Sequence, residues 1–387
     1  MNGFIRTDNI SPLNILVISS TFPTNNTDPV GGFVLDFCLK LSEQHRVTVL
    51  TQKRAETYAV DSKINLVTFL WSGSQQPLSD LKFYNPIHFF HTLSLFKNAR
   101  TALKDLTNNQ TFDHCFALWA IPSGIAAKYI FEKKNIPYSV WCLGSDIWKH
   151  KNNFFTKSLL RKILVNAQQV YGDGFKFCEE IEAFSKKSCL FLPSARNIDK
   201  TAVTVVSESR KKFVFVGRYH INKGPDVLIQ AISRLPDAVM DNAVFHFYGL
   251  GSMKTALQEM VSDARLTNVE IHDVLDTNEL FSVVSNAHFL IIPSRIDSIP
   301  VILSDTLQCG TPLIGANVGD LGDVITKYGI GYTFEKENSE ELCAKIVLAF
   351  NDLKSAYTEP IQQALTLFSV ENAVHEFIRN IQKQKQL

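Results

Sequence analysis

Short apolar runs alternate with longer amphipathic stretches along most of the chain. Brief β-branched or aromatic runs bounded by turns are typical of buried parallel strands. Phe33 opens a stretch, residues 33–41, whose apolar side chains recur at helical spacing. Alternating strands and helices predict a parallel sheet covered on both faces. In this half, strands are predicted at residues 15–18, 46–50, 64–70, 112–118, 138–143 and 169–171.

The alternation begins again after residue 210. Strands are predicted at residues 213–216, 244–248, 269–271, 289–292 and 312–314, and helices at 225–235 and over the stretch that runs through Leu257. A polar segment without periodicity, residues 194–210, is the predicted hinge. The expected fold is therefore α/β, with two Rossmann-like lobes (1–195 and 211–360) facing each other across a cleft. Residues 369–387 predict an amphipathic helix, within a C-terminal segment 361–387.

Composition narrows the class of protein. The 387 residues carry a formal net charge of +1, which argues against a nucleic-acid partner held by bulk charge. The seven cysteines are an odd number without a Cys-x-x-Cys pair, so disulfides and zinc ribbons are not expected and a reducing compartment fits. No signal peptide and no run long enough to span a bilayer is found, which predicts a cytoplasmic protein. His246 alternates with phenylalanines in a strand and is interpreted as structural.

The strongest local signal is the run from residue 291 to 312, which predicts a strand, a loop and a helix. Pro300 suits the first turn of that helix and Gly310 its C′ position. Ligands of open α/β sheets bind beyond the carboxyl ends of strands, where helix N-termini attract anions. Asp297 lies in the loop and Asp305 eight positions later in the helix. The alternatives are that Asp297 only caps the helix and that Asp305 faces solvent.

A second signal follows the strand at residues 213–216. Gly217 and Arg218 end that strand, and Lys223 precedes Gly224 and a new helix. An arginine fork and a lysine point charge at one strand end can hold a diphosphate and neutralise its charge as it leaves. The alternative is a pair of solvated surface cations.

Together these segments resemble the retaining glycosyltransferases of family four, which have the GT-B fold and belong to the glycosyl transferases of group 1. The family pattern Gly-Arg-x4-Lys-Gly-x-Asp is matched by Gly217, Arg218, Lys223, Gly224 and Asp226. A Pro-Ser…Glu-x7-Glu…Gly-x-Pro pattern is matched by Pro293, Ser294, Gly310 and Pro312, with Asp297 and Asp305 in place of the two glutamates.

The first half resembles the family more faintly. Gly31 and Gly32 match a glycine pair after the first strand, although a flexible turn is the alternative. Leu118 and Leu143 stand where the family has histidines, the second just before Gly144 and Asp146. Asp146 could instead cap a helix that begins near residue 147.

The resemblance implies a role for each matched residue. Asp297 would face the donor sugar, Arg218 and Lys223 would hold the diphosphate, and Asp305 would bind the ribose hydroxyls. The N-terminal lobe would bind the acceptor, with Gly144 and Asp146 on that side, and the C-terminal lobe would bind the nucleotide-sugar. The C-terminal helix in 361–387 would return to the N-terminal lobe. The remaining donor-binding residues would be Gly31, Gly32, Gly217, Ser298, Ile299, Pro300 and Val301.

The resemblance also implies the reaction. A nucleotide-sugar donor would pass its sugar, with retention, to a glycan or lipid-linked glycan, in polysaccharide or glycolipid assembly. No metal and no further cofactor would be needed, and the chain has no Asp-x-Asp motif of the kind that holds a metal-bound diphosphate. Two other functions stay open: a nucleotide-sugar epimerase of the same fold, and a non-catalytic glycosyltransferase-like binding subunit.

One basic stretch interleaves aromatic residues with cations. Between residues 148 and 162 the chain carries Phe154 and Phe155 among lysines. Such patterns touch anionic lipid, which would fit a lipid-linked acceptor and a peripheral contact with the inner membrane face. The alternative is a solvated helix face.

Overall fold

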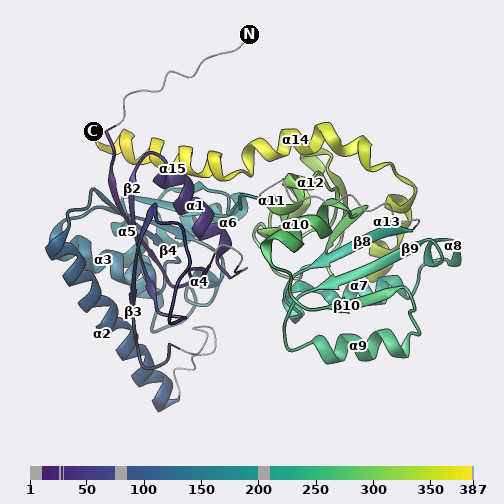
Figure 1. Cartoon of the computed structure of the whole chain (residues 1–387), viewed down its shortest axis with the longest axis horizontal. Coiled ribbons are helices and arrows are strands. Elements are labelled where there is room, and N and C mark those ends of the chain that lie inside the picture. Colours follow the sequence, from purple (N-terminus) through teal and green to yellow (C-terminus); the bar gives the residue numbers. More distant parts are fainter. Residues whose placement is uncertain (1–10, 26–27, 29, 75–84, 199–209, 386–387) are drawn as a thin grey trace, which may run out of the picture. The chain divides into compact units, whose positions relative to one another are not determined.

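The computed structural model describes residues 11–25, 28, 30–74, 85–198 and 210–385. The chain divides into two compact units, each built on a parallel sheet (Figure 1). One unit holds the described parts of residues 1–25 and 38–171 together with 184–188, and the other holds 26–37, 172–183 and 189–387. Most of the predicted hinge, residues 199–209, lies outside the described residues, so the hinge and the domain limits stay predictions.

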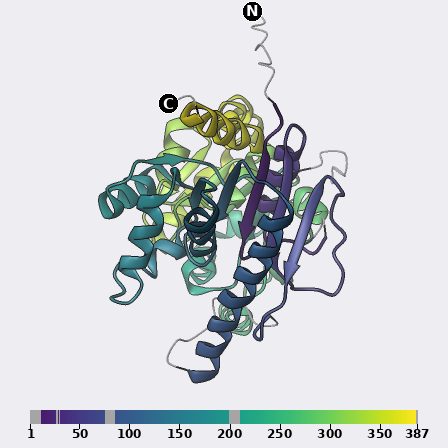
Figure 2. The same ribbon diagram turned by 90° about the vertical axis from the view of Figure 1, so that its left-hand side faces the viewer.

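The first sheet has seven strands in the order β3-β2-β1-β4-β5-β6-β7. β1 pairs in parallel with both β2 and β4, so the strand order reverses between β1 and β4. The long helix α2 packs on α3 and on β3, as the blue helix in Figure 2 shows. The strands are β1 (Asn14–Ser19), β2 (Arg46–Gln52), β3 (Ile64–Phe69), β4 (His114–Leu118), β5 (Tyr138–Cys142), β6 (Gln169–Gly172) and β7 (Cys189–Phe191). The helices of this half are α1 (Gly32–Ser42), α2 (Pro86–Asn109), α3 (Ser123–Lys134), α4 (Ser145–Trp148), α5 (Lys157–Asn166) and α6 (Phe175–Ser185).

The second sheet has six strands in the order β10-β9-β8-β11-β12-β13, the order of a Rossmann fold, which reverses between β8 and β11. The strands are β8 (Lys211–Val216), β9 (Ala243–Tyr248), β10 (Val269–His272), β11 (Phe289–Ile292), β12 (Leu313–Ala316) and β13 (Gly331–Phe334). The helices are α7 (Pro225–Ile232), α8 (Asp237–Met240), α9 (Lys254–Asp263), α10 (Thr277–Ser285), α11 (Ile302–Gln308), α12 (Leu321–Tyr328), α13 (Ser339–Asn351), α14 (Thr358–Leu367) and α15 (Val370–Lys385).

Helices bury both faces of the second sheet (Figure 1). On one face Phe213, Phe245 and Phe289 meet residues of α7, α9 and α13. On the other face Leu290 and Leu313 meet residues of α10, α11, α12 and α14. Because both faces are covered, the central strands β11 and β12 are fully buried and carry no charged residue, whereas the edge strand β10 is partly exposed.

At the carboxyl end of this sheet, loops approach so closely that glycine is needed. A Cβ on Gly224, which has φ +65°, would lie 2.0 Å from the carbonyl oxygen of Pro293. A Cβ on Gly319, which has φ +52°, would lie 2.3 Å from the carbonyl oxygen of Asp297. The loops after β8, β11 and β12 are thereby held together at the backbone.

Every predicted strand is present, with limits within three residues. β7 and β13 were not predicted, because they are very short and partly exposed. The helix predicted from Pro300 begins at Ile302 instead, with Val301 as its N-cap residue. Gly310 has φ +63° two residues after the helix ends, which confirms its predicted C′ position.

Gly331 and Gly310 offer a matched test of this backbone packing. Gly331→Ala should destabilise strongly, because its Cβ would lie 1.9 Å from the carbonyl oxygen of Leu313 and force β13 away from β12. Gly310→Ala has nothing within 4 Å of its Cβ and should cost only the left-handed backbone strain, about 1–2 kcal/mol. Urea unfolding followed by circular dichroism checks both, and equal losses would contradict this account of β13.

Candidate active site

Lys223 and Asp297 form a bidentate ion pair. Lys223 ends the short 3-10 turn η3 (Ile221–Lys223) after β8, and Asp297 lies in the loop after β11. The Lys223 Nζ is 2.7 Å from Oδ1 and 2.8 Å from Oδ2 of Asp297, and both side chains are partly buried. β8 and β11 are the neighbours between which the strand order reverses, where open α/β sheets bind ligands. Asp297 is therefore not a helix cap but part of a charged pair at the switch point.

A second ion pair holds these two loops in place. The guanidinium of Arg295 donates to both carboxylate oxygens of Asp226, at 2.8 and 2.7 Å. Its Nη1 also donates to the carbonyl oxygen of Ile221 at 2.7 Å. The last aspartate of the Gly-Arg-x4-Lys-Gly-x-Asp motif thus fixes the loop after β11 to the start of α7.

Arg218 differs from Lys223 in that, among the described residues, no partner for its charge is found. Its side chain is exposed, and within the described residues it makes no ion pair or side-chain hydrogen bond. The neighbouring backbone is fixed, because Gly217 N donates to Tyr248 O at 3.0 Å and Tyr219 N to Leu250 O at 2.8 Å. The position of Arg218 is therefore defined while its guanidinium remains available to an anion.

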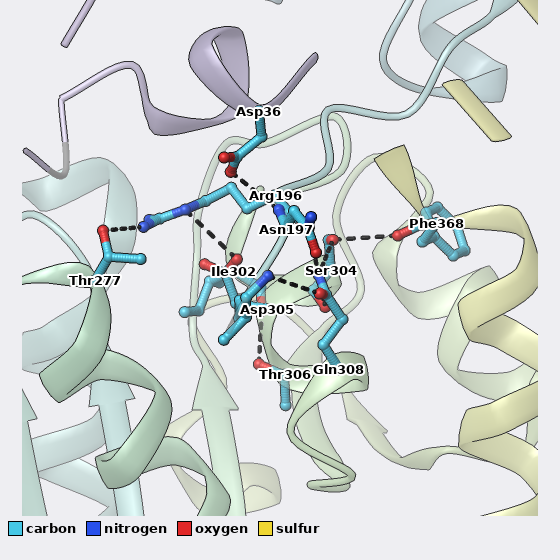
Figure 3. A network of polar contacts seen from close by, with 11 residues as sticks. Asp36, Arg196, Asn197, Thr277, Ile302, Ser304, Asp305, Thr306, Gln308 and Phe368 are labelled. Carbon is cyan, nitrogen blue, oxygen red and sulfur yellow. Dashed lines mark hydrogen bonds and ion pairs between the residues drawn. The ribbon is translucent and has the colours of Figure 1, made fainter. Parts of the chain in front are cut away.

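Asp305 lies on α11 and is only 2% exposed, so the alternative that it faces solvent is wrong. Its Oδ1 lies 3.8 Å from Nε of Arg196, whose Nη2 donates to Thr277 Oγ1 at 2.9 Å (Figure 3). Within the described residues, neither Asp305 Oδ1 nor Arg196 Nε has a hydrogen-bond partner. Burial raises the pKa of Asp305, and the charge of Arg196 opposes that rise. The two groups form a buried pair with unused hydrogen-bonding capacity.

The glycine pair at the start of α1 lies against the same arginine. Gly31 has φ +82°, and a Cβ on Gly32 would lie 3.3 Å from Nε of Arg196. Asp36 accepts a hydrogen bond from the backbone N–H of Asn197 at 2.9 Å, as Figure 3 shows. Burial raises the pKa of Asp36 from 3.8 to about 6, against the opposing charge of Arg196. Gly31 and Gly32, Asp36, Arg196 and Asp305 therefore form one group.

Arg196 and Asp36 were not predicted from the sequence. Arg196 falls in the polar stretch interpreted as hinge, three residues after Pro193. The signal that could have found it is its position: a lone arginine soon after the apolar run 189–192, at the end of a βα unit. Asp36 lies inside an amphipathic helix and carries no such signal.

The loop after β11 is also tied down at Ser298. Its hydroxyl donates to Asp173 Oδ1 at 2.6 Å, and its carbonyl oxygen accepts from Asp320 N at 3.1 Å. Ile299 is buried in the apolar core, while Pro300 and Val301 lead into α11. The side chains of Ser298 and Ile299, both predicted to bind the donor, are therefore engaged with the protein itself, Ser298 through Asp173 and Ile299 through the apolar core.

Asp146 and Gly144, predicted on the acceptor side, lie at the turn between β5 and α4. Asp146 is buried, and its carboxylate accepts from Ala120 N at 2.6 Å and Leu143 N at 3.0 Å. Burial raises its pKa to about 6, and backbone hydrogen bonds oppose that rise. Gly144 has the positive φ, +92°, that this turn requires. Asp146 lies inside α4, which begins at Ser145 with Gly144 as its N-cap residue, so the alternative that Asp146 caps a helix beginning near residue 147 is wrong. Its acceptor-side role stays a prediction.

Two further expectations concern the whole chain. All seven cysteines are free, and five of them are buried. In the part of the chain that the structure describes, no helix is both long and apolar enough to cross a bilayer.

Two family models match the chain. "Glycosyl transferases group 1" matches residues 198–364, and "Glycosyl transferase 4-like" matches residues 28–173. An uncharacterised glycosyltransferase of Methanocaldococcus jannaschii is 23% identical over 288 residues, which is 74% of this chain and 79% of the relative. A Bacillus subtilis glycosyltransferase named for teichuronic acid biosynthesis is 26% identical over 246 residues, 59% of this chain and 60% of the relative.

Solved structures agree on the fold over nearly the whole chain. Sucrose-phosphate synthase from Thermosynechococcus elongatus superimposes with a TM-score of 0.75 at 16% identity, covering 97% of this chain and 99% of that one. The Anabaena protein HepE, crystallised with UDP and glucose, gives 0.71 at 12% identity, covering 96% and 100%. These matches agree with the Rossmann order of the two sheets and with the motifs after β8 and β11. The chain therefore belongs to the group 1 glycosyltransferases and has the GT-B fold.

Proposed function

We propose that this glycosyltransferase takes a sugar from a nucleoside-diphosphate sugar and transfers it, with retention, to a glycan or lipid-linked glycan. The observation that carries the proposal is the Lys223–Asp297 pair at the switch point of the second sheet, with Arg218 exposed on the same loop. HepE, which shares the fold, was crystallised with UDP-glucose, in support of a donor of this class.

The diphosphate is assigned to Arg218 and Lys223. An ammonium group has three donors, and two of those on Lys223 point at Asp297, which leaves one for a phosphate oxygen. Arg218 can add a bidentate contact. Charge building up on the leaving diphosphate is then met by two fixed cations, without a metal ion. The amides at Pro300 and Val301 cannot supply this alone, since proline has no N–H.

The sugar and the ribose are assigned to the two aspartates. Asp297 keeps lone pairs free beside its bonds to Lys223 and can accept hydrogen bonds from sugar hydroxyls. A ribose hydroxyl between Asp305 Oδ1 and Arg196 Nε would satisfy both of those buried atoms. Each aspartate is one methylene shorter than the family's glutamate, about 1.5 Å. The buried position of Asp305 accordingly requires the donor to seat deeply.

Retention is inferred from the resemblance to the retaining glycosyltransferases of family four. The acceptor would attack from the face that the diphosphate leaves, and the departing phosphate would take the acceptor's proton. The proposed role in polysaccharide or glycolipid assembly is supported by the names of two similar proteins. The Bacillus subtilis relative is named for teichuronic acid biosynthesis, and WaaG, a protein of the same fold, for lipopolysaccharide biosynthesis.

Arg218→Ala and Lys223→Ala should each weaken donor binding and slow transfer by about 10²–10³-fold, because each removes a fixed charge from the leaving group. Lys212→Ala, at the other end of the same strand, is the matched control. Nucleotide-sugars are first screened by thermal shift, and the ligand found is then used in calorimetry and transfer assays. Normal turnover by both variants would refute the diphosphate assignment, and a strict requirement for added Mg²⁺ or Mn²⁺ would refute metal independence.

The two aspartates should separate transfer from binding. Asp297→Ala should abolish transfer while nucleoside diphosphate still binds, because Asp297 faces the sugar. Asp305→Ala should weaken binding of the nucleotide itself, through the ribose. Calorimetric titration with nucleoside diphosphate beside a transfer assay measures both, with Asp297→Glu and Asp305→Glu as variants that restore the family residue. Full transfer by Asp297→Ala, or unchanged nucleotide affinity in Asp305→Ala, would overturn these roles. A parent that bound no nucleotide-sugar would favour the non-catalytic subunit.

We also propose that the loop before α5 touches an anionic membrane surface. Phe154 and Phe155 are 89% and 86% exposed, and Lys151 and Lys157 flank them. Two large exposed aromatic side chains beside cations match the apolar and basic parts of an interfacial anchor.

The variant Phe154→Ser with Phe155→Ser should reduce co-sedimentation with phosphatidylglycerol vesicles about 10-fold or more, since burying each ring is worth about 1.5–3 kcal/mol. Leu353→Ser is the control, because that side chain is 73% exposed but lies in the second unit without an aromatic neighbour in sequence. Equal binding by the parent and the double variant would refute the contact.

A further inference from the structure

Two histidines and a glutamate gather at the edge of the second sheet. β10 is the outermost strand and pairs in parallel with β9, with Glu270 opposite His246. Residues two apart on a strand share a face, so Glu270 and His272 lie on the same side of β10. The sequence predicted His246 to be structural, because it alternates with phenylalanines in a strand. Nothing in the sequence shows that β10 will lie beside β9 and bring Glu270 and His272 close to it.

The ligand atoms of these residues form a compact triangle. His246 Nδ1 lies 3.0 Å from His272 Nε2, and Glu270 Oε2 lies 3.5 Å from the first and 3.3 Å from the second. A tetrahedral zinc ion with bonds of about 2.0–2.1 Å separates its ligand atoms by about 3.3–3.4 Å. The triangle therefore has nearly the size of one face of such a coordination sphere. Among the described residues, no other group of three histidine, cysteine or acidic side chains comes this close.

The two imidazoles are also held in position by their neighbours. Their ring centroids are 5.3 Å apart and their planes are within 14° of parallel. The ring of His272 stacks on that of Tyr248 at 4.5 Å, and the backbone carbonyl of His272 accepts a hydrogen bond from the Tyr219 hydroxyl at 2.6 Å. Side chains that are already held in position lose little conformational entropy when an ion binds, because the ion does not have to order the rings.

We propose that His246, Glu270 and His272 bind one divalent transition-metal ion of the zinc class and fasten β10 to β9. Two imidazole nitrogens and one carboxylate oxygen suit zinc rather than magnesium or calcium, which prefer oxygen alone. Glu270 is 60% exposed, so the fourth position opens to water. None of these residues belongs to the proposed donor site, and the inference does not depend on that function.

The other explanation of the same geometry is a hydrogen-bonded histidine pair with a nearby carboxylate. Metal titration separates the two. The chelator-treated full chain is titrated with zinc chloride against a chromophoric competitor, and bound metal is counted by mass spectrometry. One ion should bind per chain and should raise the midpoint of thermal unfolding.

Glu270→Gln and His272→Asn should each weaken zinc binding by about 100-fold or more, since even loss of a residue that only supports a ligand costs 10–100-fold. Glu270→Gln changes one exposed atom and should fold normally. His375→Asn is the matched control, because the His375–Glu376 pair, at 3.6 Å, offers two ligands on an exposed helix. Retained binding in the control supports the site. Failure of the parent to bind at about 1 mM zinc, or binding unchanged by Glu270→Gln and His272→Asn, would leave only the hydrogen-bonded pair.

Discussion

The close approach of backbones at the carboxyl end of the second sheet is the constraint on which the candidate active site depends. Gly224 meets Pro293, and Gly319 meets Asp297, at distances that leave no room for a Cβ. Lys223 immediately precedes one of these contacts and Asp297 takes part in the other. The spacing of the ion pair is therefore set by backbone packing. The ion pair between Arg295 and Asp226 also holds the loop after β11 against the start of α7.

The three pairs of charged side chains described above differ in what they can offer a ligand. Arg295 and Asp226 satisfy each other and are structural. Lys223 and Asp297 are neutral as a pair, but both retain hydrogen-bonding capacity. Asp305 is buried beside Arg196 with an oxygen that has no donor within the described residues. A nucleoside-diphosphate sugar carries an anionic diphosphate between the hydroxyls of its sugar and those of its ribose. The second and third pairs could bind such a ligand, whereas the groups of the first pair already satisfy each other.

The sequence predicted the two Rossmann-like lobes because buried parallel strands leave continuous apolar runs with regular spacing. It also brought together the motifs after β8 and β11, through their joint resemblance to the glycosyltransferases of family four. Asp36, and its proximity to Arg196, could not be predicted, because the two residues come from segments about 160 residues apart and meet only through tertiary packing. The burial of Asp305 was missed for the same reason: what covers it is distant in sequence. β7 and β13 are too short to stand out from their loops.

Tyr219 links two parts of the second unit that the sequence treats separately. Its buried hydroxyl lies 2.8 Å from Phe247 O and 2.6 Å from His272 O, yet it has one proton and can donate to only one of them at a time. Burial raises the pKa of this phenol, so the proton stays. Arg218 is the preceding residue, and the two carbonyls belong to neighbouring strands. A single phenol thus bridges the backbones of β9 and β10 one residue away from Arg218, so a slip of β10 along β9 would disturb the loop that carries the arginine.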